Sequence, residues 1–221
     1  MEPTGDGPQP VPSLTSELRE QMVQQQLARR DIRCTDVLQA MLTVPRHEFA
    51  FGHPIDEAYA DKPLSIGCGQ TISQPYIVAL MTQLARPEPR ARALDIGTGS
   101  GYQAALLSQL VLDVQSVEIV AVLAEQARRR LCRLGYDNIT VHTGDGTQGW
   151  SPTAPYDIII AAASPDHVPP VLLQQLAPKG RLILPIGVVR QSLMLYEKQL
   201  DGTVRESTIA PVAFVPMVGA E

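Results

Sequence analysis

Apolar, β-branched runs alternate with helix-periodic segments between residues 91 and 187. The expected strands are residues 91–97, 114–119, 139–144, 156–164 and 180–187, and the expected helices between them are residues 102–111, 120–135 and 168–177. A strand that is followed by a helix and a further strand forms a right-handed crossover and pairs in parallel. The alternation therefore predicts an α/β fold with a doubly wound, mostly parallel sheet of the Rossmann-like type.

The segments that flank this alternation have other patterns. Residues 1–13 are rich in Pro and Gly and are expected to form a disordered leader. Residues 14–90 hold two helix-periodic stretches, the first starting at Ser13 or Thr15, and then a stretch without a regular pattern. We expect an N-terminal helical extension here, joined to a core of residues 91–221 in a single structural domain.

The C-terminal part of the chain changes pattern again. Residues 192–199 and 208–218 resemble strands, and the turn sequence Asp201-Gly202 lies between them. Two strand-like runs joined by a short glycine turn form a hairpin. We therefore expect an antiparallel pair at the C-terminal edge of the sheet.

Charge and cysteine content exclude several classes of protein. The formal net charge of −5 argues against nucleic-acid and anionic-membrane partners. The run Arg128-Arg129-Arg130 is expected to lie on the solvated face of a helix. The three cysteines stand in no metal-ligand spacing, so we expect reduced thiols and no metal site. With no signal peptide and no apolar run of about 18 residues, a cytoplasmic protein is predicted.

A glycine-rich turn, "DIGTGSG", follows the first expected strand, where doubly wound sheets bind their ligands. Gly97, Gly99 and Gly101 allow a tight turn and a close approach, and the backbone amides at the helix start are expected to face an anionic group of the ligand. Tyr102-Gln103 replaces the Lys-Ser/Thr of a phosphate-binding loop. The spacing satisfies a dinucleotide fingerprint as well, so the glycines alone do not select the ligand.

Acidic residues at three successive strand ends favour a cationic adenosyl ligand. Asp95 lies two residues before Gly97, where it would repel a pyrophosphate and attract an α-ammonium group. Glu118, at the end of the second expected strand, is placed to accept hydrogen bonds from ribose hydroxyls. Asp145-Gly146, after the third, offers a carboxylate for an adenine amino group. This pattern suits S-adenosylmethionine better than NAD.

The chain resembles the protein-L-isoaspartate (D-aspartate) O-methyltransferase family. The blocks that carry the resemblance, in order along residues 15–218, are "VPRHEFAF", "AYADKPLSIGCGQTISQPYIVALM", "ALDIGTGSGYQAALL", "GDGTQGW", "APYDIIIAAAS", "LAPKGRLILPIG" and "FVPMVG". The glycine turn is common to many S-adenosylmethionine-dependent enzymes, whereas "GQTIS" is far more specific to this family.

The resemblance implies a role for each matching residue. Ser73 corresponds to the family's active-site serine, and Thr71 and Ile72 lie in the loop that borders substrate and cofactor. The residues implied to hold S-adenosylmethionine are Asp95, Gly97, Thr98, Gly99, Ser100, Gly101, Glu118, Asp145, Gly146 and Gln191. Some family members have a histidine where this chain has Tyr76, so a cofactor contact made by that histidine is not carried over.

The implied reaction is methyl esterification of the α-carboxylate of an L-isoaspartyl residue, and also of D-aspartyl residues, in flexible protein or peptide segments. The ester then closes to a succinimide, which hydrolyses partly to normal aspartate and so repairs the chain. A carboxylate with a pKa near 4 is ionised at neutral pH and needs no general base. This agrees with four histidines that stand in no arrangement with a nucleophile. The enzyme is expected to act as a monomer.

Two questions remain open from the sequence. Ser73 is also placed to cap a helix that starts at Gln74, with Pro75 in its first turn, and one hydroxyl hydrogen cannot serve both the helix and a substrate. The alternatives to an isoaspartyl methyltransferase are a methyltransferase of the same fold acting on another carboxylate or a small metabolite, an NAD-dependent oxidoreductase, and a cofactor-binding adaptor without turnover.

Overall fold

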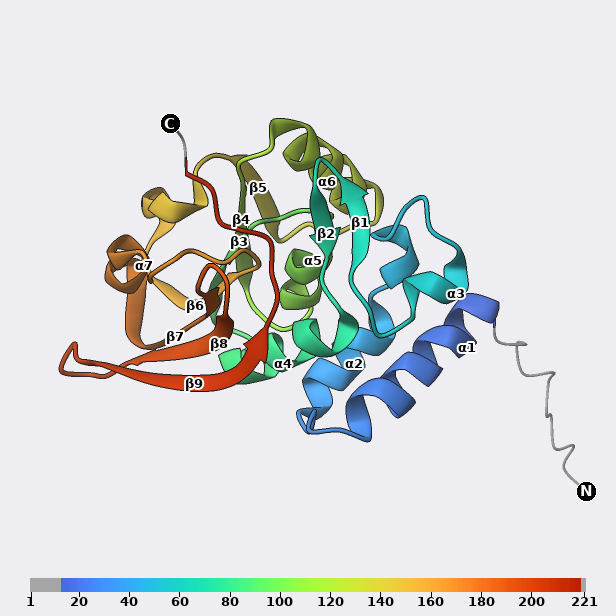
Figure 1. The fold of residues 1–221 in the computed structure, drawn as a ribbon, viewed down its shortest axis with the longest axis horizontal. Helices are drawn as coiled ribbons and strands as arrows, with labels where there is room; N and C mark the ends of the chain where they lie inside the picture. Colours follow the sequence, from blue (N-terminus) through green and yellow to red (C-terminus); the bar gives the residue numbers. More distant parts are fainter. Residues whose placement is uncertain (1–12, 220–221) are drawn as a thin grey trace, which may run out of the picture.

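A seven-stranded sheet forms the centre of the molecule in the computed structural model, which describes residues 13–219 (Figure 1). Its order is β5-β4-β3-β6-β7-β8-β9. The strands are β3 (Arg92–Ile96), β4 (Asp113–Glu118), β5 (Ile139–Thr143), β6 (Tyr156–Ala161), β7 (Leu176–Ile186), β8 (Gln191–Lys198) and β9 (Val204–Val212). The first five strands in this order pair in parallel, and β8 and β9 are antiparallel. The prediction of a doubly wound, mostly parallel sheet with an antiparallel C-terminal edge is confirmed.

Helices cover both faces of this sheet. On one face, α4 (Pro75–Ala85), α5 (Tyr102–Ser108) and α6 (Ala121–Arg133) contribute to the larger apolar cluster. On the other face, α7 (Pro170–Gln175) packs through Leu172 onto β6 and β7. Short 3-10 turns, η3 (Gly146–Gln148) and η4 (Ser151–Thr153), follow β5. The chain leaves β3 toward β4 and β5 and then returns to β6 on the other side of β3, which creates the switch point where such sheets bind ligands.

The N-terminal extension is helical, as predicted. It consists of α1 (Leu14–Gln21), which continues as the π-helical segment η1 (Met22–Ala28), then α2 (Thr35–Thr43), the 3-10 turn η2 (Arg46–Glu48) and α3 (Ile55–Ala58). Ser13 caps α1, since its side chain accepts a hydrogen bond from the Ser16 amide. The expected disordered leader, residues 1–13, lies outside the described residues apart from Ser13.

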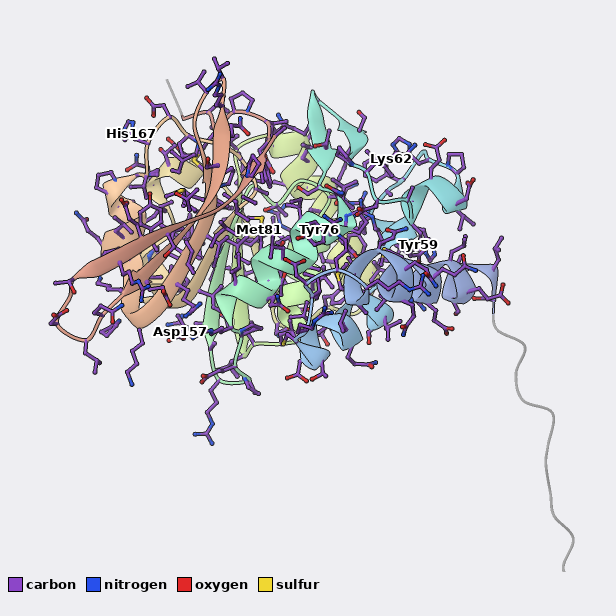
Figure 2. The ribbon with its side chains drawn as sticks, turned by 60° about the horizontal axis from the view of Figure 1, so that its bottom comes forward. Tyr59, Lys62, Tyr76, Met81, Asp157 and His167 are labelled. Carbon is purple, nitrogen blue, oxygen red and sulfur yellow. The ribbon has the colours of Figure 1, made fainter. Side chains whose placement is uncertain are left out.

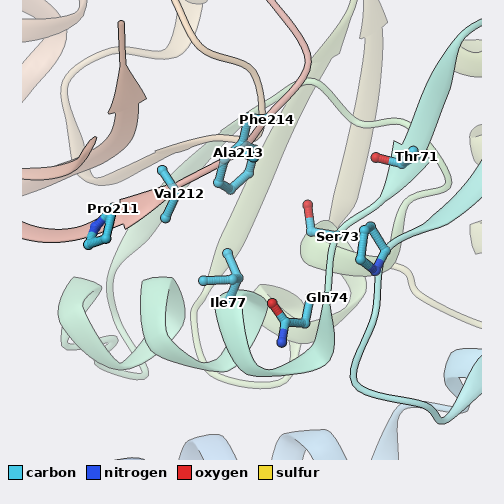
Figure 3. Close-up of a pocket in the computed structure, with 9 residues that line it drawn as sticks. Thr71, Ser73, Gln74, Ile77, Pro211, Val212, Ala213 and Phe214 are labelled. Carbon is cyan, nitrogen blue, oxygen red and sulfur yellow. The ribbon is translucent and has the colours of Figure 1, made fainter. Parts of the chain in front are cut away.

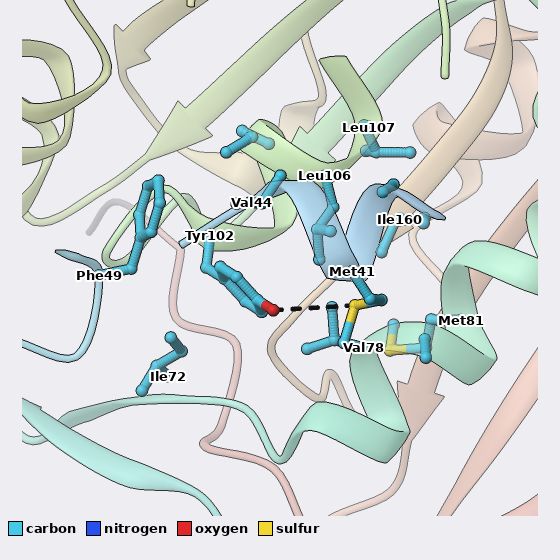
Figure 4. Packing of buried hydrophobic residues seen from close by; sticks show 14 of the residues in the cluster. Met41, Val44, Phe49, Ile72, Val78, Met81, Tyr102, Leu106, Leu107 and Ile160 are labelled. Atoms are coloured by element: carbon cyan, nitrogen blue, oxygen red, sulfur yellow. Dashed lines mark hydrogen bonds between the residues drawn. The ribbon is translucent and has the colours of Figure 1, made fainter. Parts of the chain in front are cut away.

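The extension and the sheet share one apolar core. Tyr102 of α5 is fully buried there, and its hydroxyl points toward the Met41 sulfur of α2 (Figure 4). Phe49 packs against the Tyr102 ring with centroids 5.5 Å apart. Because these contacts join residues 14–90 to the glycine-turn helix, the extension holds a fixed position beside the carboxyl ends of the strands.

A two-stranded hairpin lies where the sequence gave no regular pattern. It is formed by β1 (Leu64–Gly67) and β2 (Gln70–Ile72), a separate antiparallel sheet (Figure 1). Its strands are too short for periodicity to reveal, and its turn, Gly67-Cys68-Gly69, takes positive φ at all three residues. The hairpin carries Thr71 and leads directly to Ser73.

The last strand and the C-terminal tail also differ from the prediction. β9 begins at Val204 instead of residue 208 and ends at Val212, so residues 213–219 form an extended tail. The tail runs back across the carboxyl ends of the central strands, beside the hairpin (Figure 1). A single parallel bridge between Ser164 and Pro216 fixes it there.

Candidate active site

An open groove of about 440 Å³ lies between the start of α4 and the end of β9 (Figure 3). Thr71, Ser73 and Gln74 form one side, and Ile77 of α4 forms part of the floor. The residues of the opposite side are Pro211, Val212, Ala213 and Phe214. The groove offers two hydroxyls, those of Thr71 and Ser73, among mostly apolar walls.

A narrower crevice of about 60 Å³ lies at the carboxyl ends of β3 and β4. Its lining comes from the glycine turn, the ends of β3 and β4, the hairpin and the tail, namely Gln70, Thr71, Ile96, Gly97, Gly99, Val117, Glu118, Ile119, Val120, Gly146, Ala162, Ala163 and Val215–Val218. A third, inner hollow between the glycine turn and α4 is lined by Thr71, Ile72 and Ser73 together with Thr98 and Ser100. The crevice therefore occupies the ligand position of a doubly wound sheet.

Thr71 lines the groove, the crevice and the inner hollow, and Ser73 lines the first and the last. Both hydroxyls point toward the groove (Figure 3). The stretch from Thr71 to Ser73 is thus the junction at which a molecule in the groove and a molecule in the crevice can meet.

The structure decides between the two roles that the sequence left open for Ser73. Helix α4 begins at Pro75, its N-cap residue is Gln74, and Ser73 is not the cap. Asp61 takes over the capping, since it accepts hydrogen bonds from the Tyr76 amide at 3.2 Å and from the Gln74 side-chain amide at 2.8 Å. The hydroxyl of half-buried Ser73 makes no hydrogen bond to any other described residue, so it is available to a ligand.

Several backbone amides of the glycine turn, ahead of the start of α5 at Tyr102, are used within the protein. Gly97 and Thr98 donate to the Val117 carbonyl, and Gly101 donates to the Thr98 carbonyl. The Gly99 amide donates to Glu118 Oε2 at 2.7 Å. A pyrophosphate would find few free donors here, and the Glu118 carboxylate would repel it.

Gly99 is favoured by its positive φ and a tight contact, whereas Gly146 is favoured because a side chain would clash. Gly99 has a φ of 52°, and a Cβ on it would lie 3.2 Å from Ile66 Cδ1 of the hairpin. A Cβ on Gly146 would lie 2.4 Å from Ile96 Cγ2. Gly97, Gly99 and Gly146 line the crevice, whereas Gly101 is the N-cap residue of α5 and packs against Leu131 of α6.

Asp95 lies beneath the glycine turn, fully buried, and does not line the crevice. Its Oδ2 accepts a hydrogen bond from the Ser116 hydroxyl at 2.7 Å, and Ser116 also pairs with the Thr98 hydroxyl at 2.6 Å. Within residues 13–219, Asp95 Oδ1 has no hydrogen-bond partner. Burial, and to a lesser degree the charge of Glu118, raises the pKa of Asp95 to about 7. An orphaned, buried acceptor of this kind fits a cationic donor.

The other two acids lie at strand ends, as predicted. Glu118 lines the crevice, and its Oε1 accepts a second backbone hydrogen bond from the Val120 amide. Asp145 caps the η3 turn by accepting hydrogen bonds from the Thr147 amide and hydroxyl. A carboxylate oxygen can accept more than one hydrogen bond, so Glu118 keeps acceptor capacity at the crevice, whereas Asp145 is not among the residues that line it.

Gln191 holds the tail and does not line the crevice. Its side-chain amide donates to the Phe214 carbonyl at 3.0 Å, and its carbonyl accepts from the Phe214 amide at 2.6 Å. Through these two side-chain bonds, Gln191 at the start of β8 binds Phe214, two residues beyond its ladder partner Val212. Gln191 therefore fixes Phe214, which forms one wall of the groove.

Family models and similar proteins agree on one assignment. Residues 17–221 match the model of Protein-L-isoaspartate(D-aspartate) O-methyltransferase. A relative from Polaromonas sp., named Protein-L-isoaspartate O-methyltransferase 2, is 53% identical over 83% of this chain and 88% of its own. The chain belongs to the protein-L-isoaspartate(D-aspartate) O-methyltransferase family.

Solved structures of this family have the same fold. One protein-L-isoaspartate O-methyltransferase superposes with a TM-score of 0.83 at 30% identity, over 91% of this chain and 66% of its own longer chain. A Plasmodium falciparum protein assigned to the same methyltransferases, in complex with S-adenosyl-L-homocysteine, superposes with a TM-score of 0.80 at 26% identity, over 95% of this chain and 100% of its own. The predicted resemblance is confirmed, and the NAD-dependent oxidoreductase considered from the sequence is wrong.

Tyr76, where some family members have a histidine, is turned toward the N-terminal helices (Figure 2). Its hydroxyl donates to Asp31 Oδ1 at 2.7 Å, and the Arg30 guanidinium stacks 3.2 Å above its ring. Arg30 in turn pairs with Asp61, the cap of α4. Tyr76 thus ties the helix that follows Ser73 to the extension.

Several contributors to the site were not foreseen. Residues 213–218 of the tail were expected to continue a strand and instead line the groove and the crevice, although "FVPMVG" is one of the family blocks. Arg130 corrects the expected solvated helix face: Arg128 and Arg129 pair with Glu125 on the surface, but half-buried Arg130 donates to the Ser100 carbonyl of the glycine turn at 2.8 Å.

Other chemistries find no support in residues 13–219. Within that range, no histidine lines the groove, the crevice or the inner hollow, and no cluster of His, Cys, Asp and Glu could hold a metal ion. The three cysteines are free thiols. A search of the same range for a helix long and apolar enough to cross a bilayer finds none.

Proposed function

We propose that this chain transfers the methyl group of S-adenosylmethionine to the free α-carboxylate of an L-isoaspartyl residue in a flexible protein or peptide segment. The observation that carries the proposal is that Thr71 and Ser73 lie where the groove and the crevice meet. A two-substrate displacement needs its reacting atoms about 3 to 3.5 Å apart, which requires adjoining sites. The groove takes the acceptor and the crevice takes the donor.

The residues at the sheet edge fit S-adenosylmethionine. Gly97, Gly99 and Gly146 leave room along the crevice, and Glu118 and Asp145 accept from ribose hydroxyls and the adenine amino group. Asp95 acts on the α-ammonium group from beneath the turn, with its Oδ1 unpaired among the described residues, while Thr98 and Ser100 line the adjoining inner hollow. Gly101 and Gln191 act indirectly through α5 and the tail. When bound, the cofactor supplies a methyl group activated by its sulfonium charge.

The chain's own groups align the acceptor. Because a carboxylate is ionised at neutral pH, no residue has to remove a proton. The Ser73 hydroxyl donates to one carboxylate oxygen and leaves the other free to attack, and the Thr71 hydroxyl borders the same space. Ile72 and Phe214 shield the junction from water, and this orientation supplies a large part of the rate enhancement.

The groove suits a chain recognised mainly through its backbone. Its walls from Pro211 to Phe214 carry no charged side chain, so the neighbours of the isoaspartyl residue are weakly selected. D-Aspartyl residues are a second substrate class. The methyl ester closes to a succinimide without help from the enzyme and hydrolyses partly to normal aspartate, which makes the reaction a repair step.

Residues 14–90 contribute Thr71, Ser73, Gln74 and Ile77 to the groove, and residues 91–219 contribute its other wall and most of the crevice. All groups of the proposed site come from one chain, so the site needs no second subunit, and we propose a monomeric enzyme. The crevice of about 60 Å³ adjoins the inner hollow, since Thr71, Gly97, Gly99 and Ala162 line both spaces.

Methyl transfer to a short isoaspartyl peptide tests this function. Mass spectrometry should show the gain of one CH₂ group on the isoaspartyl peptide and none on the same peptide with normal aspartate. Equal transfer to both peptides, or to a small carboxylic acid only, would favour a methyltransferase with another acceptor. Binding of S-adenosylmethionine without any transfer would favour the adaptor.

A further inference from the structure

Arg46, in the η2 turn of the N-terminal extension, is fully buried beneath the loop that carries Ser73. Its Nε donates to the Ala58 carbonyl at 2.8 Å, and its Nη2 donates to the Ser73 carbonyl at 2.8 Å. The guanidinium lies 5.0 Å from the centroid of the Tyr102 ring. Arg46 therefore holds the backbone of Ser73 from the protein interior.

The charge of Arg46 has no counter-ion. Throughout the part of the chain that the structure describes, Arg46 forms no ion pair and its Nη1 has no hydrogen-bond partner. The Tyr102 phenol acts on Arg46 more strongly than Asp61 does, but that phenol is neutral because burial raises its pKa. Asp61 is itself engaged by Arg30, Gln74 and the Tyr76 amide. A guanidinium keeps its proton even when burial is unfavourable, so the charge persists.

An uncompensated buried cation costs free energy and normally has a partner. The inner hollow is lined by Ser73 and Tyr102, and Arg46 contacts both of these residues. Ser73 also lines the groove. An anion placed there interacts with Arg46 through a low-dielectric interior, where Coulomb attraction is much stronger than in water. The acceptor in the proposed reaction is such an anion.

We infer that Arg46 is a positioning residue for this reaction: it fixes Ser73 through the backbone and supplies the positive potential that selects an ionised acceptor carboxylate. The inference rests on the proposed function. It explains how a groove without a charged lining residue prefers an anionic group over the neutral amide of the same shape. It also explains why a charge is kept at a site where only two carbonyls need a donor.

The test compares an isoaspartyl peptide with the same peptide bearing an α-carboxamide, which cannot be methylated. Binding of both to the S-adenosylhomocysteine complex is measured for the wild type, Arg46→Met and Arg46→Lys. Arg46→Met should reduce the preference for the carboxylate about tenfold, equivalent to about 1.4 kcal/mol. Arg46→Lys should keep that preference and lose on the order of tenfold in kcat, since one point charge cannot hold two carbonyls.

Arg181→Met is the matched control. Arg181 is also buried and donates to a backbone carbonyl, that of Leu84, but it lies in β7 away from the groove and is paired with Glu197. It should lose stability without a change in carboxylate preference. An unchanged preference in Arg46→Met, or a lost preference in Arg46→Lys, overturns the inference. If Arg46→Met does not fold, Arg46→Gln, which removes the charge and keeps a side-chain donor, takes its place with the same expected loss of preference. Failure of the proposed function is distinct, because the wild type would then not methylate the isoaspartyl peptide.

Discussion

Replacing Asp95 by Asn should stabilise the ligand-free protein above neutral pH. Burial raises the pKa of Asp95 from 3.8 to about 7, so the folded protein holds a proton that the unfolded chain releases at lower pH. Between these values the native state binds more protons than the unfolded state, and stability falls as pH rises. Each tenfold change in acid dissociation is worth about 1.4 kcal/mol, so the loss between pH 4 and pH 8 is about 4 kcal/mol. Asn carries no charge and does not suffer it.

Urea unfolding at pH 4 and pH 8 measures this effect. Asp95→Asn should raise the free energy of unfolding at pH 8 by about 4 kcal/mol more than at pH 4. Any fixed cost of fitting the amide beside Ser116 cancels in this difference. Asp137→Asn, at an exposed position, is the control and should change stability by less than about 0.5 kcal/mol at either pH. An equal effect of Asp95→Asn at both pH values would refute the reasoning.

Three further substitutions test the parts of the site. Ser73→Ala should lower kcat by about 10- to 100-fold. The free energy of unfolding should change by less than about 0.5 kcal/mol, because the hydroxyl has no partner among the described residues. A large drop in the free energy of unfolding with an unchanged rate would instead indicate that Ser73 caps α4. Asp61→Ala should lower the free energy of unfolding in urea by about 1 kcal/mol, because α4 loses its cap. Asp61→Asn keeps an acceptor and should lower it less. Equal losses in the two variants would mean that the ion pair with Arg30 dominates. Gln191→Ala should raise KM for the peptide severalfold in steady-state assays, because Phe214 loses both of its hydrogen bonds to Gln191. The affinity for S-adenosylhomocysteine should change little. A weaker affinity for S-adenosylhomocysteine with an unchanged KM would instead indicate that Gln191 contacts the cofactor.

The parallel sheet could be predicted because its strands are long, buried and regularly spaced. β6 reads as one apolar run and the glycine turn after β3 marks the ligand edge, and both signals are local. The position of Glu118 in the crevice could be predicted for the same reason, because the carboxyl ends of parallel strands meet at one edge of the sheet. These inferences need no knowledge of distant contacts.

Elements formed by distant partners could not be predicted. Asp61 caps α4 from another loop, so the local pattern Ser-Gln-Pro wrongly indicated Ser73 as the cap. The glycine-turn amides bond to Val117 and Glu118 across the sheet, which the fingerprint does not show. Arg130 likewise donates to the Ser100 carbonyl, which lies 30 residues before it in the sequence. In each case a tertiary hydrogen bond replaced the partner that the local sequence suggested.

The capping by Asp61 and the backbone anchor from Arg46 have one consequence in common. Together they fix the loop on both sides of Ser73 without using its hydroxyl. A polar side chain that is half-buried and unbonded in the free protein is ready to bind at low reorganisation cost. This arrangement accounts for a serine that positions an acceptor without becoming a nucleophile.

A crystal structure with S-adenosylhomocysteine and an isoaspartyl peptide tests the central claim most directly. The account predicts the cofactor sulfur in the crevice beside Gly97 and Gly99, and the peptide extended along the groove with its α-carboxylate on the Ser73 hydroxyl. The carboxylate and the sulfur should face each other beside Thr71, where the groove and the crevice meet. A peptide bound elsewhere, or a Ser73 side chain turned away from its carboxylate, would contradict the account.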